Sequence, residues 1–124
     1  MMNIHESAED YLEAILMLRK EKGYVRSVDI ATKLNVTKPS VSFAMKRLRE
    51  NGYITMDGES LISLTDKGEE IAARILDRHT TLTEFLTELG VSAQVAAEDA
   101  CKIEHDLSEE TFRRIKEHTA STEE

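Results

Sequence analysis

The sequence contains no tryptophan, one proline, five glycines and one cysteine among its 124 residues. A single cysteine, Cys101, cannot close a disulfide within the chain, so we expect a reducing, cytoplasmic environment. No apolar run approaches the roughly 18–20 residues that cross a bilayer. The polar and acidic opening residues also lack the basic start and apolar core of a signal peptide. We therefore expect neither export nor membrane insertion.

The scarcity of proline and glycine, with 32% charged and 40% apolar residues, is typical of a helix-rich globular protein. It excludes collagen-like and disordered chains. A length of 124 residues accommodates one compact domain, or one small domain with a short annex. It excludes TIM barrels, kinases and two-domain dehydrogenases.

The acidic excess is confined to one half of the chain. Residues 1–65 hold nine lysines and arginines against nine acidic residues, whereas the remainder holds seven against fifteen and carries the whole net charge of −8. Within the neutral half, Lys38 to Arg49 contains four bases and no acid. Nucleic-acid binding is therefore compatible with this stretch. The acidic half needs a separate explanation, such as cation binding or a solvated surface.

Apolar residues at helical spacing, with capping residues at the ends, predict six helices. The first covers Glu6–Lys22 and ends at Gly23. The others are expected from Val28 to Leu34 with Ser27 as N-cap, from Thr37 to Asn51-Gly52, through Ile71 to Leu89 with an end at Gly90, from Ser92 to Leu107, and over a short stretch after Ser108. Two β-prone runs, Tyr53–Thr55 and Leu61–Leu64, flank an Asp-Gly turn and predict a hairpin. The tail from Thr119 onward has nothing to bury.

A helix, a short turn, a basic helix and a hairpin, in that order, form the layout of a winged helix-turn-helix. The second helix of this motif enters the major groove, where small polar and basic side chains suit phosphates and base edges. The predicted DNA-contacting residues are Thr37, Lys38, Ser40, Val41, Ser42, Lys46 and Arg47, and Val41 is also assigned to the packing face with Ala44, Met45 and Leu48. The hairpin tip carries Asp57 and Glu59 and no base, so we expect it to contribute little to DNA affinity.

Potential metal ligands occur in three separated segments. Cys101 stands three and four residues before Glu104 and His105, a spacing that brings all three to one helical face. Asp10 and Glu13 share a face of the first helix, and His79 interrupts the apolar row of the long helix. Thiolate, carboxylate and imidazole together are ligands for first-row transition metals. Taken separately, each of these residues fits an ordinary surface or packing role, and only their convergence would make a metal site.

The sequence resembles the DtxR/MntR family of metal-dependent transcriptional repressors. The resemblance rests on the segments Glu9-Asp10-Tyr11-Leu12-Glu13, Thr37-Lys38-Pro39-Ser40-Val41-Ser42, Leu64-Thr65-Asp66-Lys67-Gly68, Arg78-His79 and Cys101-Lys102-Ile103-Glu104-His105. It implies a mainly α fold, with a winged helix-turn-helix DNA-binding domain over residues 1–70 and an all-helical metal-binding and dimerisation domain over residues 71–124. It also implies a homodimer that binds palindromic operator DNA of metal-homeostasis genes when loaded with Mn²⁺ or Fe²⁺, with Zn²⁺, Co²⁺ or Ni²⁺ as surrogates.

The metal set implied by the resemblance is Asp10, Glu13, His79, Cys101, Glu104 and His105. A cysteine at position 101 resembles the iron-responsive branch of the family, whereas Asp10 and Glu13 resemble the manganese-responsive branch. A thiolate favours softer ions than Mn²⁺ and is open to oxidation. The choice between manganese and iron stays open.

Three alternative functions have to be weighed against this one. A winged-helix regulator that responds to a non-metal signal would show no metal-dependent DNA affinity. An enzyme would use Cys101 as nucleophile with His105 or His79 as base, but the sequence offers no oxyanion donors and no glycine-rich substrate loop, so we expect no catalysis. A purely structural interaction module would leave the basic helix without a role.

Overall fold

The computed structural model describes residues 6–122, with their side chains from residue 7 to residue 119. The elements are α1 (Glu6–Lys22), α2 (Ser27–Leu34), α3 (Lys38–Glu50), β1 (Ile54–Met56), β2 (Ile62–Leu64), α4 (Asp66–Glu88), α5 (Ala93–Ile103) and α6 (Glu109–Thr122). The mainly helical fold with one small sheet confirms the predicted class. The chain divides into two compact units, Met1–Ala73 and Arg74–Glu124, and α4 contributes to both.

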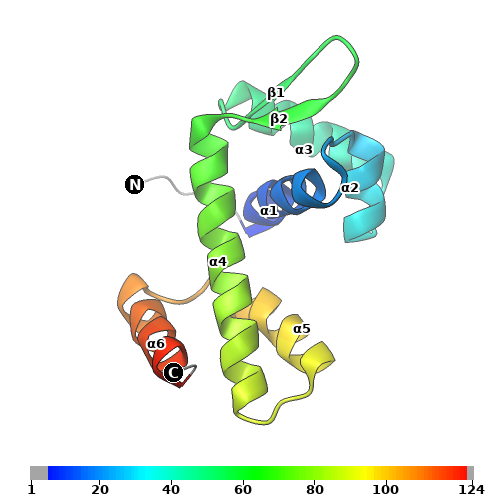
Figure 1. Cartoon of the computed structure of the whole chain (residues 1–124). Coiled ribbons are helices and arrows are strands. Elements are labelled where there is room, and N and C mark those ends of the chain that lie inside the picture. The colour runs from blue at the N-terminus through cyan, green and yellow to red at the C-terminus, as the bar shows by residue number, and fades with distance from the viewer. Residues whose placement is uncertain (1–5, 123–124) are drawn as a thin grey trace. The chain divides into compact units, whose positions relative to one another are not determined.

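In the first unit α1, α2 and α3 pack together, and the β1–β2 hairpin extends beyond them (Figure 1). Asn35 ends α2 in the left-handed conformation, with φ of 55°, and allows the sharp turn into α3. The hydroxyl of Thr37 accepts a hydrogen bond from the backbone N–H of Ser40 at 3.3 Å, which confirms Thr37 as the N-cap of α3. The unit core is built from one apolar face of each element: Leu12, Ile15, Ile30, Val41, Met45, Leu48, Ile54 and Ile62.

The hairpin is fixed to the helices at both ends. Its strands are antiparallel, with Ile54 opposite Leu64 and Met56 opposite Ile62. The N–H of Ile62 donates to the Val25 carbonyl at 2.8 Å, and the N–H of Thr65 donates to the Tyr53 carbonyl at 3.0 Å. These bonds tie β2 to the α1–α2 connection and tie the start of α4 to the start of β1.

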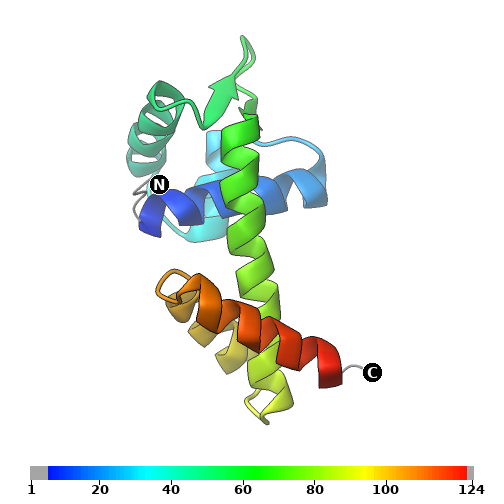
Figure 2. The same cartoon turned by 90° about the vertical axis from the view of Figure 1, so that its left-hand side faces the viewer.

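In the second unit α5 and α6 both pack against the C-terminal half of α4 (Figures 1 and 2). Ile75, Leu82, Ala96 and Ala100 are fully or almost fully buried between them. The Lys116 ammonium donates to the Asp77 carboxylate at 2.6 Å, and the rings of His118 and Phe85 meet edge to face at 6.0 Å. Polar and aromatic contacts thus hold α6, which has few apolar residues.

Three predicted helix ends were wrong. Ser27 is the first residue of α2 and not its N-cap, because the Asp29 carboxylate accepts the N–H of Arg26 at 2.9 Å and starts the helix one residue earlier. The helix expected to reach Leu107 ends at Ile103.

The third error concerns the C-terminal helix. α6 continues to Thr122, and Thr119, where we expected nothing to bury, is only 3% exposed and donates its hydroxyl to the Ile115 carbonyl at 3.0 Å. Residues 123–124 of the predicted tail lie outside the described part of the chain.

Within the described residues, no helix combines the length and the apolar character that crossing a membrane requires.

Candidate metal centre and nucleic-acid interface

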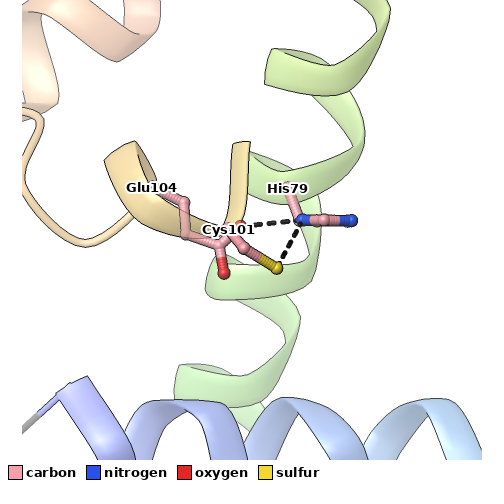
Figure 3. A group of neighbouring side chains, drawn as sticks. All are labelled: His79, Cys101 and Glu104. Atoms are coloured by element: carbon pink, nitrogen blue, oxygen red, sulfur yellow. Dashed lines mark hydrogen bonds and ion pairs between the residues drawn. The ribbon is translucent and has the colours of Figure 1, made fainter. Parts of the chain in front are cut away.

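Three of the predicted metal ligands meet within the second unit. His79 projects from the middle of α4 toward Cys101 and Glu104 at the end of α5 (Figure 3). The His79 Nδ1 atom lies 3.0 Å from Glu104 Oε2 and 3.8 Å from Cys101 Sγ. One potential ligand atom from each residue lies within 4.8 Å of the other two. Imidazole, thiol and carboxyl groups therefore converge on a point that a single ion can occupy.

The electrostatics of this cluster favour positive charge. Hydrogen bonding to Cys101, and then to Glu104, outweighs the effect of burial and raises the pKa of His79 to about 10. In the metal-free protein at neutral pH, the imidazole consequently carries a proton. The cluster stabilises a cation, and a metal ion that takes this place must displace that proton.

Glu104 provides the clearest structural indication of a ligand. Its side chain is completely buried, and its Oε1 atom has no hydrogen-bond partner among the described residues. The nearby His105 Nε2 lies 3.5 Å from Oε1, close enough for an ion pair but without hydrogen-bond geometry. A buried carboxylate oxygen without a hydrogen bond costs free energy that ligation of a cation would offset. The residues present fit a divalent transition-metal ion.

Arg78 positions the end of α5 at this cluster. Its guanidinium is buried and donates from Nη1 to the carbonyls of Glu104, at 3.0 Å, and Leu107, at 2.8 Å. Its Nη2 reaches Glu109 at 3.0 Å. Since Arg78 precedes His79 on α4, one turn of α4 supplies both a potential ligand and the arginine that holds the backbone of Glu104 in place.

The remaining predicted ligands are His105, which is adjacent to Glu104 in the second unit, and Asp10 and Glu13, which belong to the first unit. The side chain of His105, which follows Glu104, is only 2% exposed. Because α5 ends at Ile103, Glu104 and His105 are presented by the turn that follows it and not by a continuous helix. Asp10 and Glu13 lie on α1 in the first unit, where Asp10 is half-buried and Glu13 is buried. Their participation stays a prediction.

The predicted DNA-contacting residues lie at the exposed N-terminus and on the exposed face of α3. Five of them have exposed side chains on the helix itself: Lys38, Ser40, Ser42, Lys46 and Arg47. Thr37 is exposed, and its hydroxyl is committed to the cap of the helix. Val41 is 0% exposed and packs in the core, so its assignment to DNA contact was wrong and its assignment to the packing face holds.

Sequence reasoning missed one residue of this face, Phe43. Its side chain is 63% exposed, and the Arg47 guanidinium lies 5.7 Å from the centre of its ring. Helical geometry could have predicted its exposure, because on a helix of 3.6 residues per turn position 43 lies opposite the packing positions 41, 45 and 48.

The acidic hairpin tip is partly explained by its own turn. The Asp57 carboxylate accepts the N–H groups of Glu59 and Leu61 at 2.9 and 3.0 Å. Asp57 thus shapes the loop between the strands, as aspartate commonly does in turns.

Two family models match the chain. One, described as the iron dependent repressor N-terminal DNA binding domain, matches residues 3–60. The other, described as the iron dependent repressor metal binding and dimerisation domain, matches residues 65–124. Together they cover most of the chain, in the same order as the two structural units.

Individual relatives agree with these models. The chain is 41% identical to an HTH-type transcriptional regulator of Methanocaldococcus jannaschii over 113 residues, 90% of each chain. It is 42% identical to the transcriptional regulator MntR of Escherichia coli over 107 residues, 86% of this chain and 69% of MntR. The crystal structure of IdeR from T. acidophilum matches with a TM-score of 0.82 at 30% identity, over 97% of this chain and 56% of IdeR. The chain therefore spans little more than half of that solved structure.

Proposed function

The chain belongs to the iron-dependent repressor family of metal-dependent transcriptional regulators, the DtxR/MntR group, and from this premise we propose that it represses metal-homeostasis genes by binding operator DNA as a homodimer when Mn²⁺ or Fe²⁺ is bound. The observation that carries the proposal is the cluster of His79, Cys101 and Glu104, with its buried carboxylate oxygen that lacks a hydrogen bond.

We propose that His79, Cys101, Glu104 and His105 of the second unit hold the ion together with Asp10 and Glu13 of α1. When bound, a divalent ion supplies positive charge that several anionic ligands can share. Carboxylates gathered around one point repel one another until their charge is neutralised. Neutralisation also reduces the repulsion between this acidic protein and DNA phosphates. Ligands contributed by both units would hold the units in one orientation, and this is how metal binding would be coupled to DNA binding.

The first unit supplies the DNA-reading surface of the proposal. In a dimer, the two α3 helices must enter successive major grooves about 34 Å apart. Lys38, Lys46 and Arg47 are exposed on α3 and able to contact phosphates or base edges. A dimer whose units keep a fixed orientation presents both helices at that spacing, whereas one with freely oriented units pays an entropic cost on binding.

Exposed apolar side chains in the second unit support dimerisation there. Leu89 is 65% exposed, Val95 45% and Ile103 37%. Burial of exposed apolar side chains against a partner is favourable. A second copy of the chain is the partner that the family model for residues 65–124 favours.

The role of Cys101 distinguishes this proposal from catalysis. Members of the family are transcriptional regulators and not enzymes. We assign Cys101 to metal ligation, and the activity to metal-switched DNA binding in the cytoplasm.

A metal titration of DNA affinity tests the function directly. Duplexes would first be selected from a randomised pool by the full chain in the presence of Mn²⁺. Binding of the selected duplex would then be followed by fluorescence anisotropy while chelated protein is titrated with Mn²⁺, Fe²⁺, Co²⁺ or Zn²⁺. We expect the metal to tighten binding at least tenfold, and we expect Glu104→Gln to abolish this response.

Glu98→Gln is the matched control, because Glu98 lies on α5, the helix that precedes Glu104, but is exposed and outside the cluster. It should respond to metal like the unmodified chain. DNA binding that is unaffected by chelation would overturn the proposal in favour of a regulator with a non-metal signal. Absence of any DNA binding, with every metal, would favour a structural interaction module.

A further inference from the structure

The side chain of Phe43 is the most exposed large apolar group described in the first unit, at 63%. It lies on the outer face of α3, and the opposite face packs Val41, Met45 and Leu48 into the core. An aromatic ring held in water at the centre of a helix face is energetically unfavourable, and its burial in a complex removes that cost. Binding of a partner to this face of α3 would therefore be favoured by burial of the ring.

The surroundings of the ring indicate which kind of partner fits. Between Lys38 and Arg49 the helix carries four bases and no acid, and all four bases are exposed within six residues of Phe43. An apolar protein surface covering Phe43 would have to desolvate these neighbouring cations without neutralising them, which is costly. The DNA major groove accepts an apolar side chain and neutralises the surrounding cations with phosphates.

The chemistry of the major groove narrows the contact further. Of the groups that the four bases present there, only the C5-methyl group of thymine is apolar. Hydrogen-bond donors and acceptors of the other base edges gain nothing from an aromatic ring and lose water when it covers them. A phenyl ring directed into the groove consequently favours thymine.

Arg47 helps to fix the direction of the ring. Its guanidinium lies 5.7 Å from the ring centre, one helical turn further along α3. A cation over an aromatic face is attracted by the ring quadrupole and restricts the motion of both side chains. A ring with only two side-chain torsions, held in this way, loses little conformational freedom on binding.

We propose that Phe43 is a specificity-determining residue that selects thymine in each operator half-site through contact with its methyl group. The inference rests on the proposed function, because it requires that α3 enters the major groove. It goes beyond that function in assigning a base preference to a named side chain. Contact with one methyl group is worth about fourfold in affinity, so two symmetric half-sites give about fifteenfold.

Replacement of thymine by deoxyuridine tests the contact, because it removes only the methyl group. The Mn²⁺-selected duplex would carry deoxyuridine at one symmetric pair of thymine positions at a time. For the unmodified chain we expect one pair whose replacement weakens binding about fifteenfold. For Phe43→Ala we expect affinity for the original duplex to fall to about that level, with no further loss on replacement. Phe43→Leu keeps an apolar side chain and should retain part of the discrimination.

Two control variants separate this effect from general weakening. Lys46→Ala removes a charge from the same helix and should lower affinity for both duplexes by the same factor, with a weaker dependence on salt. Val28→Ala shortens another exposed apolar side chain of the first unit. It should change neither the affinity for the original duplex nor the loss of affinity on thymine replacement. Circular dichroism would verify that each variant is folded.

The outcomes distinguish the inference from the function on which it rests. If metal-dependent binding persists but no thymine replacement matters, or if Phe43→Ala keeps the same sensitivity to deoxyuridine, the inference is wrong and the function stands. If Phe43→Ala leaves DNA binding intact and instead changes the oligomeric state, the ring serves a protein contact. If the unmodified chain binds no DNA with any metal, the function itself fails.

Discussion

At the scale of single residues, the candidate metal centre combines local relations, which the sequence predicts, with long-range contacts, which it does not. The spacing of Cys101, Glu104 and His105 predicted that three candidate ligands would share a helical face, because helical neighbours are set by local geometry. The distance of 3.0 Å between His79 and Glu104 joins residues 25 positions apart and follows from the packing of α5 on α4. No local pattern determines that packing. The burial of Glu104, which supplies the main structural support for a ligand, was equally invisible in the sequence.

The thiolate of Cys101 should set the metal preference of the centre. Cys101→Glu replaces a soft sulfur ligand by a hard oxygen, which suits Mn²⁺ better than Zn²⁺ or Co²⁺. We expect the concentration of Mn²⁺ that half-activates DNA binding to fall relative to that of Co²⁺ by about tenfold. The ratio would be measured by anisotropy with the selected duplex. Cys101→Ser, which loses the thiolate without adding charge, should weaken the response to both ions, and an unchanged ratio in Cys101→Glu would exclude Cys101 as a ligand.

At the scale of helices and strands, the elements themselves could be predicted well because their signals are local. Thr37 and Asn35 flank the turn of the helix-turn-helix, and both act on backbone groups within a few residues. The end of α5 could not be predicted. The Arg78 guanidinium, from α4, binds the carbonyls of Glu104 and Leu107, and a carbonyl engaged in this way is less available to continue a helix. The same residue was recognised in the sequence only as a neighbour of His79.

The start of α2 should depend on pH through Asp29. A hydrogen bond from the Lys22 ammonium, with a further one from the N–H of Arg26, holds the pKa of the Asp29 carboxyl below its usual range. Because the folded-state pKa is depressed, the stabilisation is present above the unfolded pKa of about 4 and is lost as the pH falls through the lower, folded value. Asp29→Asn should therefore destabilise the protein by about 1 kcal/mol at pH 7. The difference should shrink below about pH 4.

Thermal unfolding followed by circular dichroism over pH 2.5–7 would measure this difference. Glu59→Gln is the control, because Glu59 is an exposed turn residue whose substitution removes the same charge without touching a helix end. A constant gap between Asp29→Asn and the unmodified chain across this range would contradict the explanation.

Gly68, in the first turn of α4, should tolerate no side chain. A Cβ atom at this position would overlap the carbonyl oxygen of Tyr53, which already accepts the N–H of Thr65. Both partners are backbone, so relief requires moving α4 away from the hairpin. Gly68→Ala should cost about 1–3 kcal/mol in the free energy of unfolding, measured with urea. Gly58→Ala, in the hairpin turn, faces open space, and a similar loss there would show that general backbone effects are responsible.

At the scale of the whole molecule, charge is divided unevenly between the two units. The acidic excess lies after residue 65, while the exposed bases of α3 lie before it. The division was visible in the sequence, because counting charges needs no fold. The exposed apolar side chains of the second unit were not, since periodic apolar positions predict burial within the chain. Val95 and Ile103 are apolar positions of the helical pattern from Ser92 to Leu107, but they are 45% and 37% exposed. Surface of this kind in an otherwise acidic unit favours contact between copies.

Val95→Asp therefore tests whether operator binding requires the dimer. A buried, unpaired carboxylate at an apolar interface is strongly unfavourable, so the dimer should dissociate at least tenfold more readily. Sedimentation velocity over a range of concentrations would measure this change. Val28→Asp is a closely matched control for assembly, since Val28 is 47% exposed in the first unit and receives the same charge. It should remain dimeric.

Binding to the full operator and to a duplex with one half-site would distinguish loss of the dimer from damage to the DNA-contacting face of α3. Because two α3 helices contact two half-sites, monomeric Val95→Asp should lose most of its affinity for the full operator. Its affinity for a duplex that contains one half-site should equal that of the unmodified chain, since the variant leaves α3 intact. A variant that is monomeric yet binds the full operator normally would show that one copy suffices. A variant that remains dimeric would move the interface away from Val95. Either result would show that DNA recognition does not depend on dimerisation through Val95. Loss of both the dimer and the affinity for the full operator would show that it does.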